Sequence, residues 1–130
     1  MSSQILSRRD LEFLLHEWLD VERLTARPRY ADHDRTTFDA VLELAERIAT
    51  DHFAPHNKLS DANEPTFDGE RVQLIPEIKK ALDVFAESGL PAANLDAEYG
   101  GMQLPHVVGS ACTAWFQAAA IATQSYALLT

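Results

Sequence analysis

The C-terminal part of the sequence constrains the fold most, because it contains no Asp, Glu, Lys or Arg from Tyr99 to Thr130, although the formal net charge of the chain is -9. An exposed helix normally carries charge on one face, so we expect this segment to be buried in protein or lipid. It ends in Ala127-Leu128-Leu129-Thr130, without the Gly, Lys or Pro that usually follows a helix. We therefore expect an incomplete polypeptide whose last helix is covered by a missing partner.

Length and charge exclude several classes of protein. A chain of 130 residues forms one domain with a single core. The acidic balance argues against nucleic acid or anionic membrane as a partner, since both select basic surfaces. The single cysteine, Cys112, allows no internal disulfide, and no signal peptide is visible near Met1. These features predict a cytoplasmic protein.

The uncharged run also raises the question of a membrane span, for which about 20 apolar residues are needed. Scattered small and polar residues and the lack of a basic flank oppose this interpretation; these residues are Gly109, Ser110, Thr113, Gln117, Thr123, Gln124 and Ser125. We therefore predict a helix packed inside protein and no membrane span, with a tail-anchored membrane protein as an alternative.

The first half of the chain shows helical periodicity. Ser7 is a candidate N-cap, and apolar residues then recur at helical spacing: Leu11, Leu14, Leu15, Trp18 and Leu19. With Pro28 beyond it, the first helix is predicted over Arg8 to Thr25. Thr36 or Thr37 is the candidate N-cap of a second helix, which is stopped by Pro55. Its buried stripe is predicted to be Phe38, Val41, Leu42, Ala45, Ile48, Ala49 and Phe53.

The second half of the chain contains clear turn and cap signals. Asp68-Gly69 indicates a tight turn between two short extended segments. Pro76 opens the next helix and Gly89 follows its end, with Ile78, Ala81, Leu82 and Phe85 on the buried face. After a loop, Pro105 opens a helix that continues to the end of the chain, because Ala118-Ala119-Ala120 contains no breaker. Everything periodic is helical, so the predicted fold class is all-α.

The sequence shows no catalytic constellation. His52 and His56 are four residues apart, as two metal ligands on a helix can be, but Pro55 lies between them and no supporting ligand follows. We therefore predict no metal site. Cys112 lies on an apolar face, which favours a buried, inert thiol. Glu98 beside Tyr99 is a single carboxylate in a loop.

Several motifs together resemble the N-terminal domain of the acyl-CoA dehydrogenases. The main element is Tyr99-Gly100-Gly101, which follows Gly89-Leu90-Pro91 and precedes Leu104-Pro105. Phe53-Ala54-Pro55 is similar to a helix end of that family. Residues 68–76 are similar to the stretch before its next helix, and residues 9–17 to the leader helix of its larger members. On this basis residues 1–34 would be a leader and connector, and residues 35–130 the helical domain, without the middle and C-terminal domains.

The resemblance implies a function for the full-length protein. It would be an FAD-dependent enzyme of fatty-acid β-oxidation that dehydrogenates an acyl-CoA at its α and β carbons, with an electron-transfer-flavoprotein-like acceptor and a homo-oligomeric assembly. The family's catalytic glutamate belongs to a region absent here, so no catalytic residue and no bound FAD are expected in this chain. The last helix would wall the acyl pocket, with Gln124, Ser125, Leu128 and Leu129 as the substrate-binding residues.

Two features depart from the family pattern. Ala114-Trp115 stands where many members carry an acidic pair, and Ala118-Ala119-Ala120 offers no break where relatives separate two helices. A different class of function also fits the residues: a non-enzymatic acidic helical adaptor that buries its uncharged helix in a partner protein.

Overall fold

The computed structural model describes residues 3–129, and there it confirms the all-α class. The α-helices are α1 (Arg8–Glu12), α2 (Arg35–Ile48), α3 (Asn57–Ala62), α4 (Pro76–Glu87) and α5 (His106–Leu128). Two short strands, β1 (Thr66–Phe67) and β2 (Val72–Gln73), pair antiparallel. No helix within these residues combines the length and the hydropathy needed to cross a membrane.

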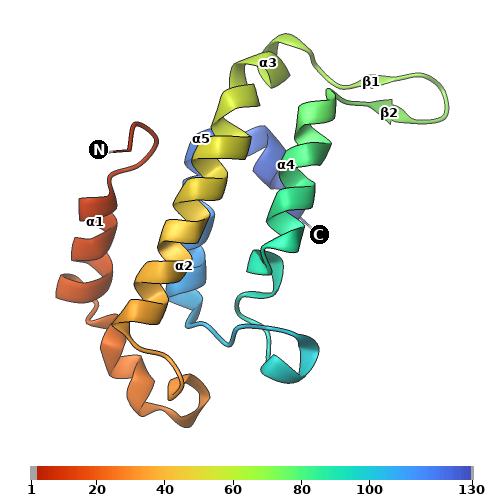
Figure 1. Ribbon diagram of the computed structural model, residues 1–130. Helices are drawn as coiled ribbons and strands as arrows, with labels where there is room; N and C mark the ends of the chain where they lie inside the picture. The colour runs from red at the N-terminus through yellow and green to blue at the C-terminus, as the bar shows by residue number, and fades with distance from the viewer. Residues whose placement is uncertain (1–2, 130) are drawn as a thin grey trace.

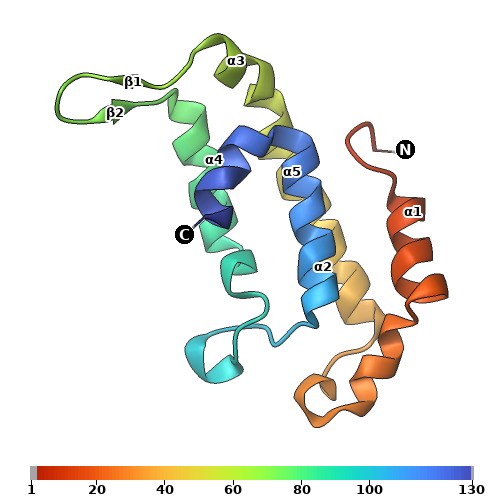
Figure 2. The same cartoon turned by 180° about the vertical axis from the view of Figure 1, so that it is seen from behind.

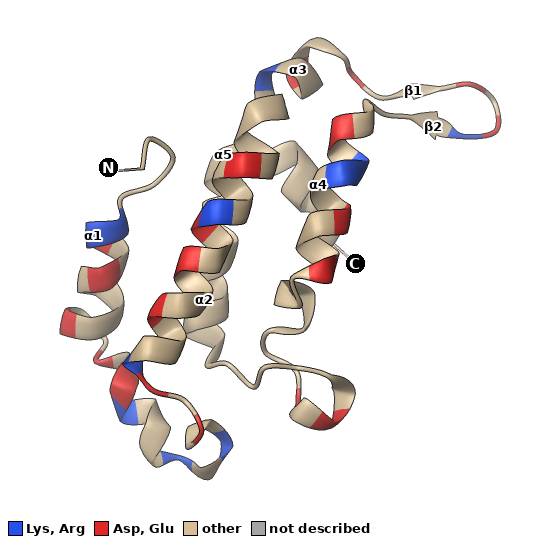
Figure 3. Ribbon diagram, viewed as in Figure 1, with Lys and Arg blue, Asp and Glu red and all other residues tan. Residues whose placement is uncertain are grey.

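The core lies between α2, α4 and α5. Figure 1 shows α2 in front of α5, with α1 along one side and the hairpin projecting beyond α4. The largest side chains that are almost fully buried include Trp115, Phe38, Phe53 and Phe116. Charged residues lie on α2 and α4 but not on α5 (Figure 3). α5 packs against α2 and α4, and this burial explains how the fold accommodates a helix without charged residues.

The signals read around α4 are confirmed. Pro76 is at the first turn of α4, and Gly89 follows its end in the left-handed conformation with φ 80°. The expected hairpin is also present, with Phe67 opposite Val72. In the turn between the strands, Gly69 has φ 103°. Because these are local signals, the sequence alone is sufficient to place them.

The first helix is not continuous, which corrects the prediction of one helix from Arg8 to Thr25. Ser7 caps α1 as expected by accepting a hydrogen bond from the Asp10 amide. However, residues Phe13–Trp18 are π-helical, and residues Val21–Ala26 form a 3₁₀ helix. Between them Asp20 adopts the left-handed conformation with φ 49°, which Asp tolerates better than most residues. Of the predicted apolar stripe, Leu15 is buried, whereas Leu14, Trp18 (69%) and Leu19 are exposed.

The start of α2 also differs from the prediction. The N-cap is Asp34, not Thr36 or Thr37, and its carboxylate accepts a hydrogen bond from the Thr37 amide at 2.8 Å. That backbone hydrogen bond holds the pKa of Asp34 below its ordinary value. Thr37 instead completes the capping box, because its hydroxyl accepts from the Asp34 amide.

Pro55 does not stop the second helix, contrary to the prediction. The helical path continues from α2 through a π-helical segment, Ala49–Phe53, and a 3₁₀ turn, Ala54–His56, into α3. Pro55 sits in the first turn of that 3₁₀ segment, where a missing N–H is tolerated. The change of helix type therefore accommodates the proline without ending the path.

α5 is bent, whereas the sequence predicted a continuous helix. Ala120 has φ -161° and ψ 85°, which is not helical. Figure 2 shows the end of α5 turned away from its first half and running across α4. The break thus falls within Ala118-Ala119-Ala120, where the family pattern places one and the local sequence gives no signal for it.

Candidate functional site

The predicted substrate-binding residues all lie after the bend, in the folded-back half of α5 (residues 121–128) or just beyond it. The structure separates them into two pairs. Gln124 is buried, with 3% of its surface exposed, and Leu128 is half exposed; both line one cavity. Ser125 and Leu129 do not line it. The Ser125 hydroxyl donates to the Ala122 carbonyl at 2.6 Å, and Leu129 is 83% exposed.

The cavity lies between the two halves of α5 and the chain that follows α4. Its volume is about 260 Å³, and its lining combines apolar and polar side chains, including Phe85, Phe116, Asn94 and Thr113. The Gln124 side-chain oxygen, Oε1, is buried and has no hydrogen-bond partner. A buried acceptor without a partner is unfavourable.

Cys112 also borders this cavity, and the prediction of a buried thiol is confirmed. Burial raises the pKa of Cys112 to about 12. A thiol is nucleophilic only as the thiolate. Cys112 therefore contributes shape to the cavity rather than reactivity.

The folded-back half is joined to the chain before α3 by a buried hydrogen bond. His56 Nε2 lies 2.7 Å from Thr123 Oγ1, and the two residues are 3% and 0% exposed. On the other side of the ring, His56 Nδ1 lies 2.8 Å from the His52 carbonyl oxygen. Within residues 3–129, no group of three or more His, Cys, Asp or Glu is arranged to hold a metal ion.

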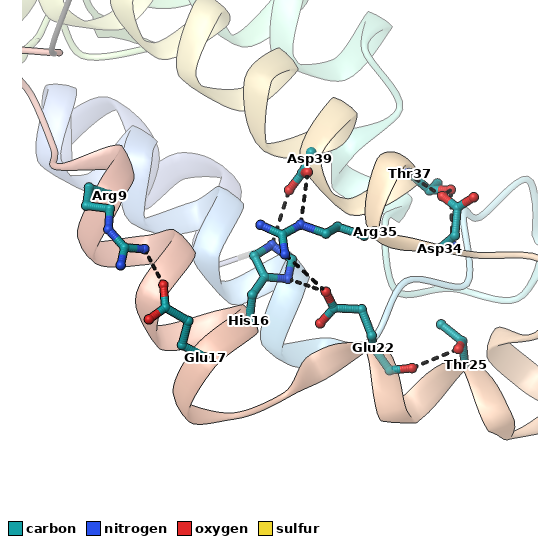
Figure 4. A network of polar contacts seen from close by, with 9 residues as sticks. All are labelled: Arg9, His16, Glu17, Glu22, Thr25, Asp34, Arg35, Thr37 and Asp39. Atoms are coloured by element: carbon teal, nitrogen blue, oxygen red, sulfur yellow. Dashed lines mark hydrogen bonds and ion pairs between the residues drawn. The ribbon is translucent and has the colours of Figure 1, made fainter.

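A second polar cluster fixes the leader against α2 (Figure 4). The His16 ring is buried between two carboxylates, with Nδ1 2.9 Å from Glu22 and Nε2 3.1 Å from Asp39. Arg35 lies near both acids, at 3.7 Å and 3.6 Å. Because both ring nitrogens have carboxylate partners, His16 has no free nitrogen for a substrate. The cluster therefore has a structural role.

No sequence motif points to a role for His16, because its partners lie six and 23 residues away. Burial acts to raise the pKa of Glu22, but the hydrogen bond with His16, a backbone hydrogen bond and the charges of His16 and Arg35 together lower it.

The loop around Gly100-Gly101 is held by internal hydrogen bonds. The Gly100 amide donates to the Ala97 carbonyl and the Gly101 amide to the Asp96 carbonyl, each at 3.0 Å. Asp96 also forms an ion pair with Arg29 of the connector. Since both glycine amides are already paired and an acid lies beside them, this loop is unsuited to binding a phosphate. Beside it, Tyr99 is 72% exposed.

Comparisons with known proteins support the family resemblance. No family model matches the chain. It is 33% identical over 108 residues to 3-methylmercaptopropionyl-CoA dehydrogenase of Ruegeria pomeroyi. The aligned region covers 81% of this chain and 18% of that protein. It is also 33% identical over 86 residues to butyryl-CoA dehydrogenase of Syntrophomonas wolfei. This second aligned region covers 63% of this chain and 14% of that protein. The chain thus spans less than a fifth of the length of these relatives, and it is similar to acyl-CoA dehydrogenases over most of its own length.

Proposed function

We propose that this chain is the N-terminal helical domain of an FAD-dependent acyl-CoA dehydrogenase. The observation that carries the proposal is the similarity to two such dehydrogenases, one of them over 81% of the chain. The bent α5 adds support, because the family pattern has a break at that point and the local sequence does not predict one. Within this proposal, residues 1–34 are the leader and connector, and residues 35–130 are the domain itself.

The domain's role in such an enzyme would be to wall the acyl pocket. The end of α5 carries exposed apolar side chains, Leu128 (52%) and, just beyond the helix, Leu129 (83%). An apolar surface of this kind suits an acyl chain, for which each buried methylene is worth about 0.8 kcal/mol. We keep Gln124, Ser125, Leu128 and Leu129 as the proposed contact residues. Gln124 and Leu128 have the stronger support, because they share a cavity.

The loop at Gly100-Gly101 does not offer a site for the pyrophosphate of a flavin cofactor. The Gly100 and Gly101 amides, which could have met a pyrophosphate, are engaged within their own turn. FAD, which accepts the hydride in this family, would be held by the other domains, and we assign no catalytic residue to this chain. Fatty-acid β-oxidation, an electron-transfer-flavoprotein-like acceptor, a homo-oligomer and a cytoplasmic location belong to the same proposal.

The substitution Leu128→Trp in the longer enzyme tests the pocket. The larger side chain would shorten the cavity while leaving the reacting carbons untouched. We expect kcat/KM to fall for long acyl-CoA substrates and to change little for short ones. Ile121→Trp is the matched control, since Ile121 lies on the same half of α5 but does not line the cavity. A uniform loss across chain lengths would refute the pocket assignment.

The adaptor function is the second candidate, and the same exposed apolar side chains favour it. Both functions require a partner surface over the end of α5, so stability measurements do not separate them. The reading frame beyond Thr130 separates the two functions. A continuation of several hundred residues with a β-rich middle domain supports the dehydrogenase, whereas a stop codon supports the adaptor.

A further inference from the structure

The bend in α5 has no cause in the sequence around it. Sharp bends in helices usually coincide with Pro, with Gly or Ser, or with an inserted side chain. Residues 117–122 read Gln-Ala-Ala-Ala-Ile-Ala, and Ala has the highest helix propensity of all residues. The local sequence therefore favours a straight helix, and contacts of the folded-back half with the rest of the domain must stabilise the bend.

The His56–Thr123 hydrogen bond is such a contact, and its polarity can be assigned. The His52 carbonyl oxygen can only accept, so His56 Nδ1, 2.8 Å away, carries a proton. In the neutral ring Nε2 is then an acceptor, and the Thr123 hydroxyl donates to it over 2.7 Å. Both groups are almost completely buried, so loss of either partner leaves the other without a hydrogen bond.

Thr123 behaves differently from neighbouring hydroxyl residues of α5. The Thr113 hydroxyl donates to the Gly109 carbonyl at 3.1 Å, and the Ser125 hydroxyl to the Ala122 carbonyl at 2.6 Å. Both bonds stay within the helix and cannot orient it relative to another element. Thr123 lies three residues after the bend at Ala120, and its hydroxyl instead reaches His56 in the 3₁₀ turn Ala54–His56.

We infer that His56 is a positioning residue: through Thr123 it sets the direction of the folded-back half of α5. Gln124 is the next residue along the chain and Leu128 lies one turn further, so fixing Thr123 also fixes where these two side chains meet the cavity. The meaning of that face as an acyl-pocket wall rests on the proposed function. The positioning itself does not.

Hydrogen exchange of the 130-residue chain tests the inference. Thr123→Val removes the hydroxyl and keeps the shape of the side chain. We expect the amides of residues 121–128 to exchange about tenfold faster, because a buried acceptor loses its partner, while residues 108–116 stay as protected as before. Thr123→Ser, which keeps the hydroxyl, should restore slow exchange. His56→Phe should reproduce the effect of Thr123→Val.

Thr113→Val is the matched control, because it removes a hydroxyl whose hydrogen bond stays within the same helix and keeps the shape of the side chain at the cavity. It should leave exchange in residues 121–128 unchanged. The inference is overturned if Thr123→Val leaves these amides as protected as in the native chain, or if it speeds exchange equally in both halves of α5. If His56→Phe does not fold, the threonine variants still decide.

This experiment is independent of catalysis. A positive exchange result together with uniform kinetics for Leu128→Trp would retain His56 as a positioning residue and refute the pocket. The reverse result would retain the pocket and refute the role of His56.

Discussion

Phe116 is the side chain whose removal should most weaken the core. It is 1% exposed and lies between Phe53 of the π-helical segment and Phe85 of α4. Both ring centroids are 4.9 Å from its own, with interplanar angles of 63° and 72°. These edge-to-face contacts join three elements that are distant in sequence. Phe116→Ala would therefore leave a cavity at the point where α2's continuation, α4 and α5 meet.

The expected loss can be estimated from this environment. A buried Phe→Ala change costs about 3–5 kcal/mol, and the two aromatic contacts place Phe116 in the upper part of that range. The whole free energy of unfolding of a domain is about 5–15 kcal/mol. We thus expect Phe116→Ala to remove about 4–5 kcal/mol, a large share of the total, without changing the fold class.

Urea unfolding followed by far-ultraviolet circular dichroism measures this loss. The transition midpoint should fall while the slope with denaturant stays the same. Phe67→Ala is the control, because Phe67 is 69% exposed on the hairpin, and it should cost less than about 1 kcal/mol. If Phe116→Ala costs no more than Phe67→Ala, the aromatic cluster does not hold these elements together.

Three further predictions concern separate parts of the chain. The pKa of Glu22 is lowered in the folded state, so its contribution to stability is present above its ordinary pKa and is lost as the pH falls through the lowered pKa. Glu22→Gln should therefore reduce the loss of melting temperature in acid. An unchanged dependence of melting temperature on pH would contradict this. With a pKa of about 12, Cys112 should react with a thiol reagent only as fast as the chain unfolds, so rapid labelling of the native chain would show that the site is open. A Cβ on Gly101 would overlap the Leu95 backbone, so Gly101→Ala should lower the free energy of unfolding by about 1–3 kcal/mol and with it the melting temperature. An unchanged melting temperature would mean that this close approach is easily relieved.

The sequence by itself determined those parts of the fold that depend on near neighbours. The apolar stripe of α2 is buried at Phe38, Val41 and Ala45. The start of α4 at Pro76 and its end just before Gly89 follow from backbone chemistry alone. The hairpin at Asp68-Gly69 belongs to the same group. In each case the signal and the structure lie within a few residues of one another.

The candidate site shows where such signals are no longer sufficient. Helical spacing placed Gln124, Ser125, Leu128 and Leu129 on neighbouring positions, but it could not show which of them face the cavity. The structure buries the polar Gln124 and exposes the apolar Leu129. This arrangement is the reverse of an ordinary amphipathic helix, so hydrophobic periodicity cannot reveal it.

Only the tertiary structure decided the bend at Ala120 and the burial of His16. The alanine-rich run favours a straight helix, and the bend follows from contacts such as His56 with Thr123, which are 67 residues apart. His16 is likewise held by Asp39, 23 residues away. Contacts at such separation depend on how whole elements pack, and they can outweigh local propensities, which amount to less than about 1 kcal/mol per residue for most residue types.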